Sequence, residues 1–244
     1  MVSQVIGDLL PSAVGVALSP IPIIAVILML GTARARTDGP AFAAGWMLGM
    51  VAVAAVVLVL TSSADTSSTA SDGVNWVKVA IGILFFVLAA KQWRTRPAPG
   101  EEPEMPGWMK TIDEIEPGRA FVLGAGLSGL NPKNLALTLA ATATISQAGL
   151  STGDTVVAVL VFVLLASITV VGAVAFYLVA EDRAKAPLAE IKQFMVAHNA
   201  VIMMVILVVL GAKILGEGIA LRAVDIDEVK DLVAWGLGIL IEAH

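Results

Sequence analysis

One lysine lies in the middle of an apolar segment, where a positive charge is costly and therefore informative. Lys133 follows Asn131 and Pro132 and precedes Asn134. A charged side chain at the bilayer centre costs about 3 kcal/mol even on lenient scales, so an intramembrane lysine indicates a functional site. A helix that begins after Pro132 also presents free N–H groups and the positive end of its dipole. Together these groups favour an anion such as phosphate, sulfate or carboxylate.

A second interruption has a similar sequence. It reads Ser19-Pro-Ile-Pro22, and both interruptions begin with Gly-x-small-Leu-Ser, at Gly15 and at Gly124. Proline removes a backbone donor and clashes with the preceding turn, so each segment is predicted to be a broken or kinked helix. Pro20 can open a new half-helix with Ser19 as its N-cap. Lipid tolerates unpaired backbone only where it lines a protein cavity, so paired breaks indicate a transporter's binding site.

The predicted substrate site combines these two interruptions. Two structural alternatives stay open: the lysine ammonium only bonds carbonyls freed by the proline, and the Ser-Pro-Ile-Pro break is a packing kink without a ligand. Lys78 and Lys213 lie toward the ends of two other apolar segments, where snorkelling to the interface accounts for them, with an anion path as the alternative. The predicted substrate-binding residues are Ser19, Pro20, Pro22, Asn131, Pro132, Lys133 and Asn134.

The elements that hold these residues are membrane-spanning helices. The chain has 244 residues, of which 58% are hydrophobic and 14% charged, whereas soluble domains carry about 25% charged residues. There is no cysteine, which excludes a disulfide framework and a thiolate metal site. Runs of about 20 apolar residues are long enough to span. Six helices are predicted, at 9–31, 40–61, 74–93, 120–147, 154–180 and 193–217.

The basic residues predict the orientation. Loops 32–39 and 181–192 and segment 91–119 hold lysine and arginine, whereas the N-terminal end and loops 62–73 and 148–153 hold none. The positive-inside rule therefore places both termini outside the inner membrane. The two broken helices then face opposite ways, which predicts an all-α fold with a 3+3 inverted-topology repeat. The predicted parts are a first repeat over 1–93, a cytoplasmic linker over 94–118, a second repeat over 119–217 and an amphipathic outer-face tail over 218–244.

Several classes of function lack their sequence signals. All Asp and Glu residues lie in loops, at helix ends or in the tail, and none lies in the interior of a predicted span, which argues against a proton-driven or divalent-cation carrier. No phosphate loop, zinc signature or nucleophile elbow is present, so neither an enzyme nor a metal, a cofactor or a nucleic-acid partner is predicted. His198 without ligand partners is weak support for a metal. Gly45 and Gly49 form a small-xxx-small pair that predicts close helix packing.

With six helices, paired breaks and Asn-Pro-Lys in the fourth helix, the chain resembles the LysE exporter superfamily. Within that superfamily it is most similar to the GAP/Sap family, which addresses peptidoglycolipid or sulfolipid-1 to the cell surface. The resemblance covers residues 5–221 and leaves out the tail after Arg222. It implies a protein of an actinobacterial inner membrane that helps to move a large envelope glycolipid. The similar stretches are 18–30, 92–94 (Gln-Trp-Arg), 129–134 (Gly-Leu-Asn-Pro-Lys-Asn) and 213–216 (Lys-Ile-Leu-Gly).

Three hypotheses about function follow. The first is a lipid carrier or flippase that takes an anionic or sugar headgroup past Lys133, with membrane lipids and a glycolipid or anionic amphiphile as its partners. The second is an exporter of small, amino-acid-like solutes. The third is a non-transporting accessory subunit that docks onto a large lipid exporter. A homodimer is compatible with all three. An apolar lateral opening would favour the first, a closed polar pocket the second, and a filled core the third.

Overall fold

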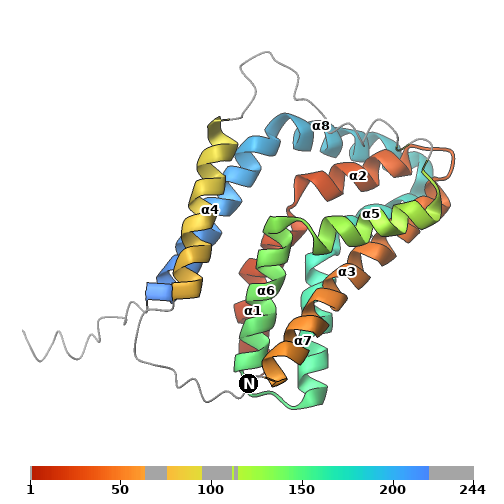
Figure 1. Ribbon diagram of the computed structural model, residues 1–244. Helices are drawn as coiled ribbons and strands as arrows, with labels where there is room; N and C mark the ends of the chain where they lie inside the picture. The colour runs from red at the N-terminus through yellow and green to blue at the C-terminus, as the bar shows by residue number, and fades with distance from the viewer. Residues whose placement is uncertain (1, 64–75, 95–111, 113–114, 220–244) are drawn as a thin grey trace, which may run out of the picture.

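The computed structural model describes residues 2–63, 76–94, 112 and 115–219, and the regular structure in these residues is helical (Figure 1). Most of the predicted linker, loop 62–73 and the tail therefore lie outside the described residues. The helices are α1 (Val2–Ala17), α2 (Pro20–Leu30), α3 (Ala35–Ser63), α4 (Trp76–Arg94), α5 (Pro117–Gly129), α6 (Pro132–Gln147), α7 (Thr152–Ala166) and α8 (Ile168–Ile219).

Both predicted helix breaks are present. α1 and α2 are bent by 55° at the break before Pro20, and α5 ends at Gly129 before α6 begins at Pro132. Each proline is the first residue of its new helix, where the missing N–H would have had no partner in any case and the fixed φ angle suits the helix. The same residue type at the same helix position therefore accounts for the break at both sites.

The two interrupted helices are joined at their breaks. α1 and α6 run side by side, and α2 and α5 turn away from them toward the same end of the molecule (Figure 1). The chain runs toward the break in α1 and away from it in α6, so the C-terminal end of α1 meets the N-terminal end of α6. The largest side chains of the surrounding core, which are almost completely buried, are Leu9, Phe42, Trp46, Phe85 and Phe162.

The predicted glycine packing on the second span is confirmed. A Cβ atom at Gly45 would overlap the carbonyl of Phe121, and one at Gly49 would lie 2.7 Å from the carbonyl oxygen of Ala125. Gly124 on α5 makes the reciprocal approach to the backbone at Phe42. The absence of side chains at these positions lets the backbones of α3 and α5 come into direct contact, as small residues do between membrane helices.

Two predicted loops are wrong in part. Segment 181–192 is helical, because α8 continues through it to Ile219 with one non-helical residue, Ala180 (φ −141°, ψ 54°). Segment 32–39 is also shorter than predicted, because α3 begins at Ala35. Charged residues do not end a helix when they lie on a solvated face, and the polar part of α8 follows its bend at the end of the molecule. The charges mark where the chain leaves the apolar region and not where the helix stops.

The apolar helices make this a membrane protein, although the six-span repeat is not confirmed. In the described residues, two helical stretches are long and apolar enough to cross a membrane, Ala35–Val59 and Ile168–Gly216, and a third is obtained if α1 and α2 count as one bent span. At about 1.5 Å per residue, the 52 residues of α8 exceed the roughly 30 Å hydrocarbon core more than twofold. α8 is thus long enough to hold two of the predicted spans.

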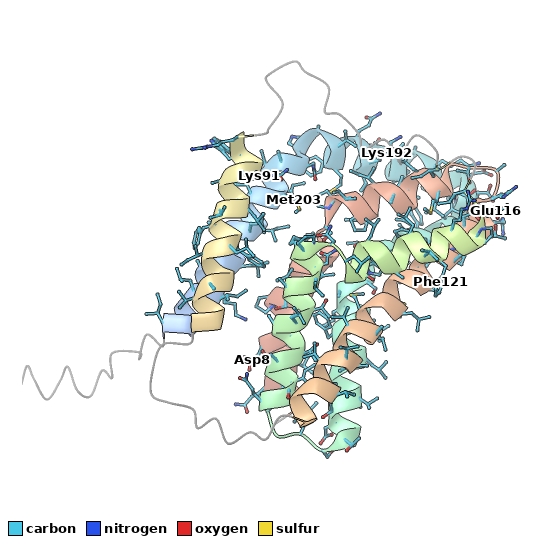
Figure 2. The ribbon with its side chains drawn as sticks, viewed as in Figure 1. Asp8, Lys91, Glu116, Phe121, Lys192 and Met203 are labelled. Atoms are coloured by element: carbon cyan, nitrogen blue, oxygen red, sulfur yellow. The ribbon has the colours of Figure 1, made fainter. Side chains whose placement is uncertain are left out.

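The basic segments gather at one end of the molecule. Lys91, Glu116 and Lys192 lie toward the end at which α8 bends, whereas Asp8 lies toward the N-terminal end (Figure 2). The turn between α2 and α3 and the start of α5 are at this same end (Figure 1). We call it the basic end, since it carries Arg34, Arg36, Arg119, Arg183 and Lys185 in addition to the lysines above.

Candidate functional site

Lys133 reaches across to the end of α1. Its ammonium donates a 2.7 Å hydrogen bond to the carbonyl oxygen of Gly15, and the residue is only 3% exposed. That carbonyl is in the last turn of α1, where helix carbonyls lack their usual i+4 partners and the helix dipole is negative. The lysine thus stabilises a broken helix end. In the described residues it has no carboxylate partner, and this is the only hydrogen bond that its ammonium makes.

Asn134 joins three of the helix ends. Its Oδ1 accepts a 2.7 Å hydrogen bond from the hydroxyl of Ser19, and its Nδ2 donates to the carbonyl of Leu127 at 3.1 Å. Ser19 precedes α2, Leu127 is in the last turn of α5, and Asn134 is in the first turn of α6. Asn134 is completely buried, so both bonds form where water cannot compete and unpaired groups would be costly.

The prediction for Ser19 is correct in position and wrong in bonding. Ser19 does occupy the N-cap of α2, but its side chain makes no capping hydrogen bond there. The hydroxyl donates to Asn134 on the other break instead. Asn131 is the residue that caps by its side chain, because its Oδ1 accepts from the backbone N–H of Lys133 at 3.1 Å. Its cap fixes the first turn of α6 from which the lysine extends.

The surroundings of the breaks are more polar than the sequence indicated. The Thr169 hydroxyl donates a 2.6 Å hydrogen bond to the carbonyl oxygen of Ala17, so a second carbonyl at the end of α1 has a partner. The hydroxyls of Thr138 and Ser167 are buried and have no hydrogen-bond partner in the described part of the chain. Serine and threonine are common in membrane helices, so their types gave no signal that would have distinguished these three residues.

The remaining predicted residues differ in their placement. Pro20 and Pro22 are buried, whereas Pro132 is exposed. The side chain of Lys78 lies outside the described residues, and Lys213 is exposed on α8, so the anion path stays a prediction. His198 stacks on Phe194. Over the described residues, no group of three or more histidine, cysteine or acidic side chains is arranged to hold a metal ion.

A cleft at the basic end was not predicted. It has a volume of about 300 Å³ and lies between the end of α2 and the bent part of α8. It is separate from the breaks, where the polar side chains are packed. Its lining residues are Ile27, Leu28, Leu30, Gly31, Tyr177, Lys185, Leu188, Ala189 and Lys192.

An ion-pair cluster lies beside the cleft. The guanidinium of Arg36 contacts the Glu181 carboxylate at 3.0 Å, and the hydroxyl of Tyr177 donates to the same carboxylate at 3.1 Å. Lys185 is near both Glu181 and Asp182, at 3.7 and 3.3 Å. These contacts tie the start of α3 to the bend of α8. The sequence indicated the positive charges here only as topology signals.

The fold and site define an all-helical membrane protein whose two interrupted helices are joined through a buried lysine, asparagine and serine. A family model described as Sap, sulfolipid-1-addressing protein, matches residues 9–220, and the chain belongs to this family. The predicted Sap assignment is thereby confirmed. No curated protein and no solved structure matches the chain.

Proposed function

We propose that this protein helps to export or flip an envelope glycolipid across the inner membrane, with the lipid's anionic headgroup bound at the helix breaks near Lys133. Family membership supports a role in sulfolipid export or addressing. The single observation that carries the finer proposal is the lysine itself, which is buried in an apolar bundle and bonded to a backbone carbonyl. A buried lysine without an anionic partner among the described residues supports a site for an anionic ligand.

The mechanism that we derive is an exchange of partners. In the closed arrangement, the Gly15 carbonyl occupies the ammonium and the Ser19 hydroxyl occupies Asn134. An anionic headgroup that enters between the breaks would replace the carbonyl at the ammonium, because a hydrogen bond to a charged acceptor is stronger than one to a neutral acceptor. Release of the Gly15 carbonyl would then free α1 to move relative to α6. Binding and opening are coupled through one side chain.

The test compares lysine variants at the break with a matched control. We expect Lys133→Ala to abolish the appearance of the glycolipid at the cell surface while the folded protein stays in the membrane. Lys133→Arg should retain part of the activity, since the charge is kept but the compact ammonium is not. Arg183→Ala, which removes an exposed positive charge at the basic end, should export normally. Surface lipid extracts and melting of the purified variants are the measurements.

A second candidate function is supported by the packed core. The residues at the breaks are buried, and the described clefts lie elsewhere, which is compatible with an accessory subunit that does not itself transport. Normal surface lipid in cells with Lys133→Ala would favour this role and remove the lysine from the mechanism. A small-solute exporter would instead show solute retention in the variant with no change in surface lipid.

A further inference from the structure

We propose that the cleft between the end of α2 and the bend of α8 binds the headgroup of an anionic membrane lipid. This inference deepens the proposed function by giving it a lipid-receiving site, and it rests on that function for its physiological role but not for the binding itself. A volume of about 300 Å³ is at the lower end of ligand pockets. That space suits a headgroup and leaves the acyl chains outside, in the surrounding lipid.

The cleft has one amphipathic wall on α8. Lys185, Leu188 and Lys192 are spaced at i, i+3 and i+7, so they share one helix face. Leu188 is 5% exposed and forms the apolar floor between the two lysines. α2 supplies the opposite wall with Ile27 and Leu30, which are also buried. A ligand in this cleft therefore meets apolar side chains along its length and ammonium groups at two points.

The charge of the cleft favours an anion. Among its lining residues are two lysines and no acid. The carboxylate of Glu181, beside the cleft, is already engaged by Arg36 at 3.0 Å and by the hydroxyl of Tyr177 at 3.1 Å. Lys185 is paired with Asp182 at 3.3 Å and with Glu181 at 3.7 Å. Lys192 has no ion-pair partner in the part of the chain that the structure describes, so its positive charge is available to a ligand.

The position of the cleft favours a lipid over a free anion. α2 is almost entirely apolar and buried up to Leu30, and the charged part of α8 begins directly after Ala180. The cleft therefore lies where the chain passes from apolar to charged, which is the level of lipid headgroups, and basic clusters at this level attract anionic lipids. A soluble anion would gain nothing from Ile27 and Leu188.

The test is a lipid titration of the purified full-length chain in detergent, with bound lipids counted by native mass spectrometry. We expect phosphatidylglycerol to bind more tightly than phosphatidylcholine. Lys192→Gln should weaken phosphatidylglycerol about fivefold, which corresponds to one surface charge against an anionic lipid. The matched control is Arg183→Gln, which removes an equal charge from the same bend of α8 outside the cleft lining. Ala189→Trp, at an exposed lining residue, should block the site while both lysines remain.

Three results would overturn the site. Equal weakening by Arg183→Gln would show that net charge alone attracts the lipid. Equal binding of phosphatidylcholine would remove the role of the lysines. Glycerol 3-phosphate that displaces the lipid with the same dependence on Lys192 would identify a soluble anion as the occupant. These outcomes are distinct from failure of the proposed function, which is read from surface lipid in Lys133 variants and not from binding to purified protein.

Discussion

The Lys133 ammonium lies 2.7 Å from the carbonyl oxygen of Gly15, a residue 118 positions earlier in the chain. A cation in the first turn of its own helix opposes that helix's dipole, which is positive at the N-terminal end. The side chain avoids this cost by extending to the C-terminal end of α1, where the dipole is negative. The antiparallel pairing of α1 and α6 allows this contact, because it places the C-terminal end of α1 beside the N-terminal end of α6.

The charge at position 133 can be separated from its packing with Lys133→Met, which keeps the length of the side chain. Loss of a hydrogen bond from a charged group costs about 1.5–3 kcal/mol, whereas removal of a buried intramembrane charge returns about 3 kcal/mol. Because these terms nearly cancel, we expect the melting temperature of the purified variant to change by only about a few degrees. Surface lipid should nevertheless be lost. A large drop in melting temperature would instead assign Lys133 a purely structural role.

The link between the two breaks is open to a double-mutant cycle. Ser19→Ala removes the donor to Asn134, and Asn134→Leu removes the acceptor together with the bond to Leu127. We expect each single change to lower the free energy of unfolding by about 1–3 kcal/mol, with a coupling of about 1 kcal/mol between them. Equilibrium unfolding in mixed micelles gives the free energy of unfolding of the unchanged protein, the two single variants and the double variant.

The control for this cycle pairs Ser19→Ala with Thr144→Ala. Among the residues that the structure describes, the Thr144 hydroxyl bonds only to the carbonyl of Ala140 in its own helix, so these two changes should be additive. A coupling as large in the control as between Ser19 and Asn134 would show that the cycle measures a general loss of helicity. The measured coupling could then not be assigned to the hydrogen bond between Ser19 and Asn134.

The close contact of α3 with α5 predicts opposite effects on stability for alanine substitutions at two glycines of α5. A methyl group at Gly124 would meet the Trp46 backbone nitrogen at 2.9 Å and overlap the carbonyl of Phe42, whereas one at Gly126 would meet nothing within 4 Å. We expect Gly124→Ala to reduce the yield of folded protein and lower its melting temperature. Gly126→Ala should be neutral or stabilising by up to about 1 kcal/mol through helix propensity. Similar melting of the two variants would contradict the close packing.

The orientation can be read from two engineered cysteines, because the chain has none of its own. Thr152 and Ala186 are both exposed. Thr152 begins α7 and Ala186 is in the bent part of α8, and these two segments are at opposite ends of the molecule (Figure 1). We expect a membrane-impermeant maleimide to label Thr152→Cys in intact cells and Ala186→Cys only after lysis, since the positive-inside rule places the basic end in the cytoplasm. The reverse pattern would invert the topology and place the proposed lipid cleft at the outer leaflet.

The helix breaks could be predicted because their causes are local. Pro20 and Pro132 each act on the turn directly before them, and a lysine in an apolar run is visible without any structure. The partner of that lysine could not be predicted, because the Gly15 carbonyl is a backbone atom whose availability depends on the break in a different helix. The sequence offered both a ligand role and a carbonyl-bonding role, and the structure shows the carbonyl bond.

The cleft at the basic end could not be predicted for a related reason. Its walls come from α2 and from α8, mainly from segment 181–192, which the basic residues indicated as a loop. The segment stays helical, so Lys185, Leu188 and Lys192 fall on one face instead of scattering along a flexible connection. The helical spacing of the apolar and charged residues in this segment was the available signal for a helix. The basic residues were instead interpreted as marking a cytoplasmic loop.

The pairing of the two broken ends also bears on how the chain enters the membrane. When α1 has been inserted, the carbonyl oxygen of Gly15 has no lysine to accept from until α6 arrives, 118 positions later. The Ser19 hydroxyl likewise waits for Asn134. Exposed backbone acceptors are costly in lipid, so we expect the bend between α1 and α2 to form only after α6 has been inserted. We therefore expect that neither half of the chain folds completely by itself, and that a gene divided between them would need both pieces in one membrane to yield either.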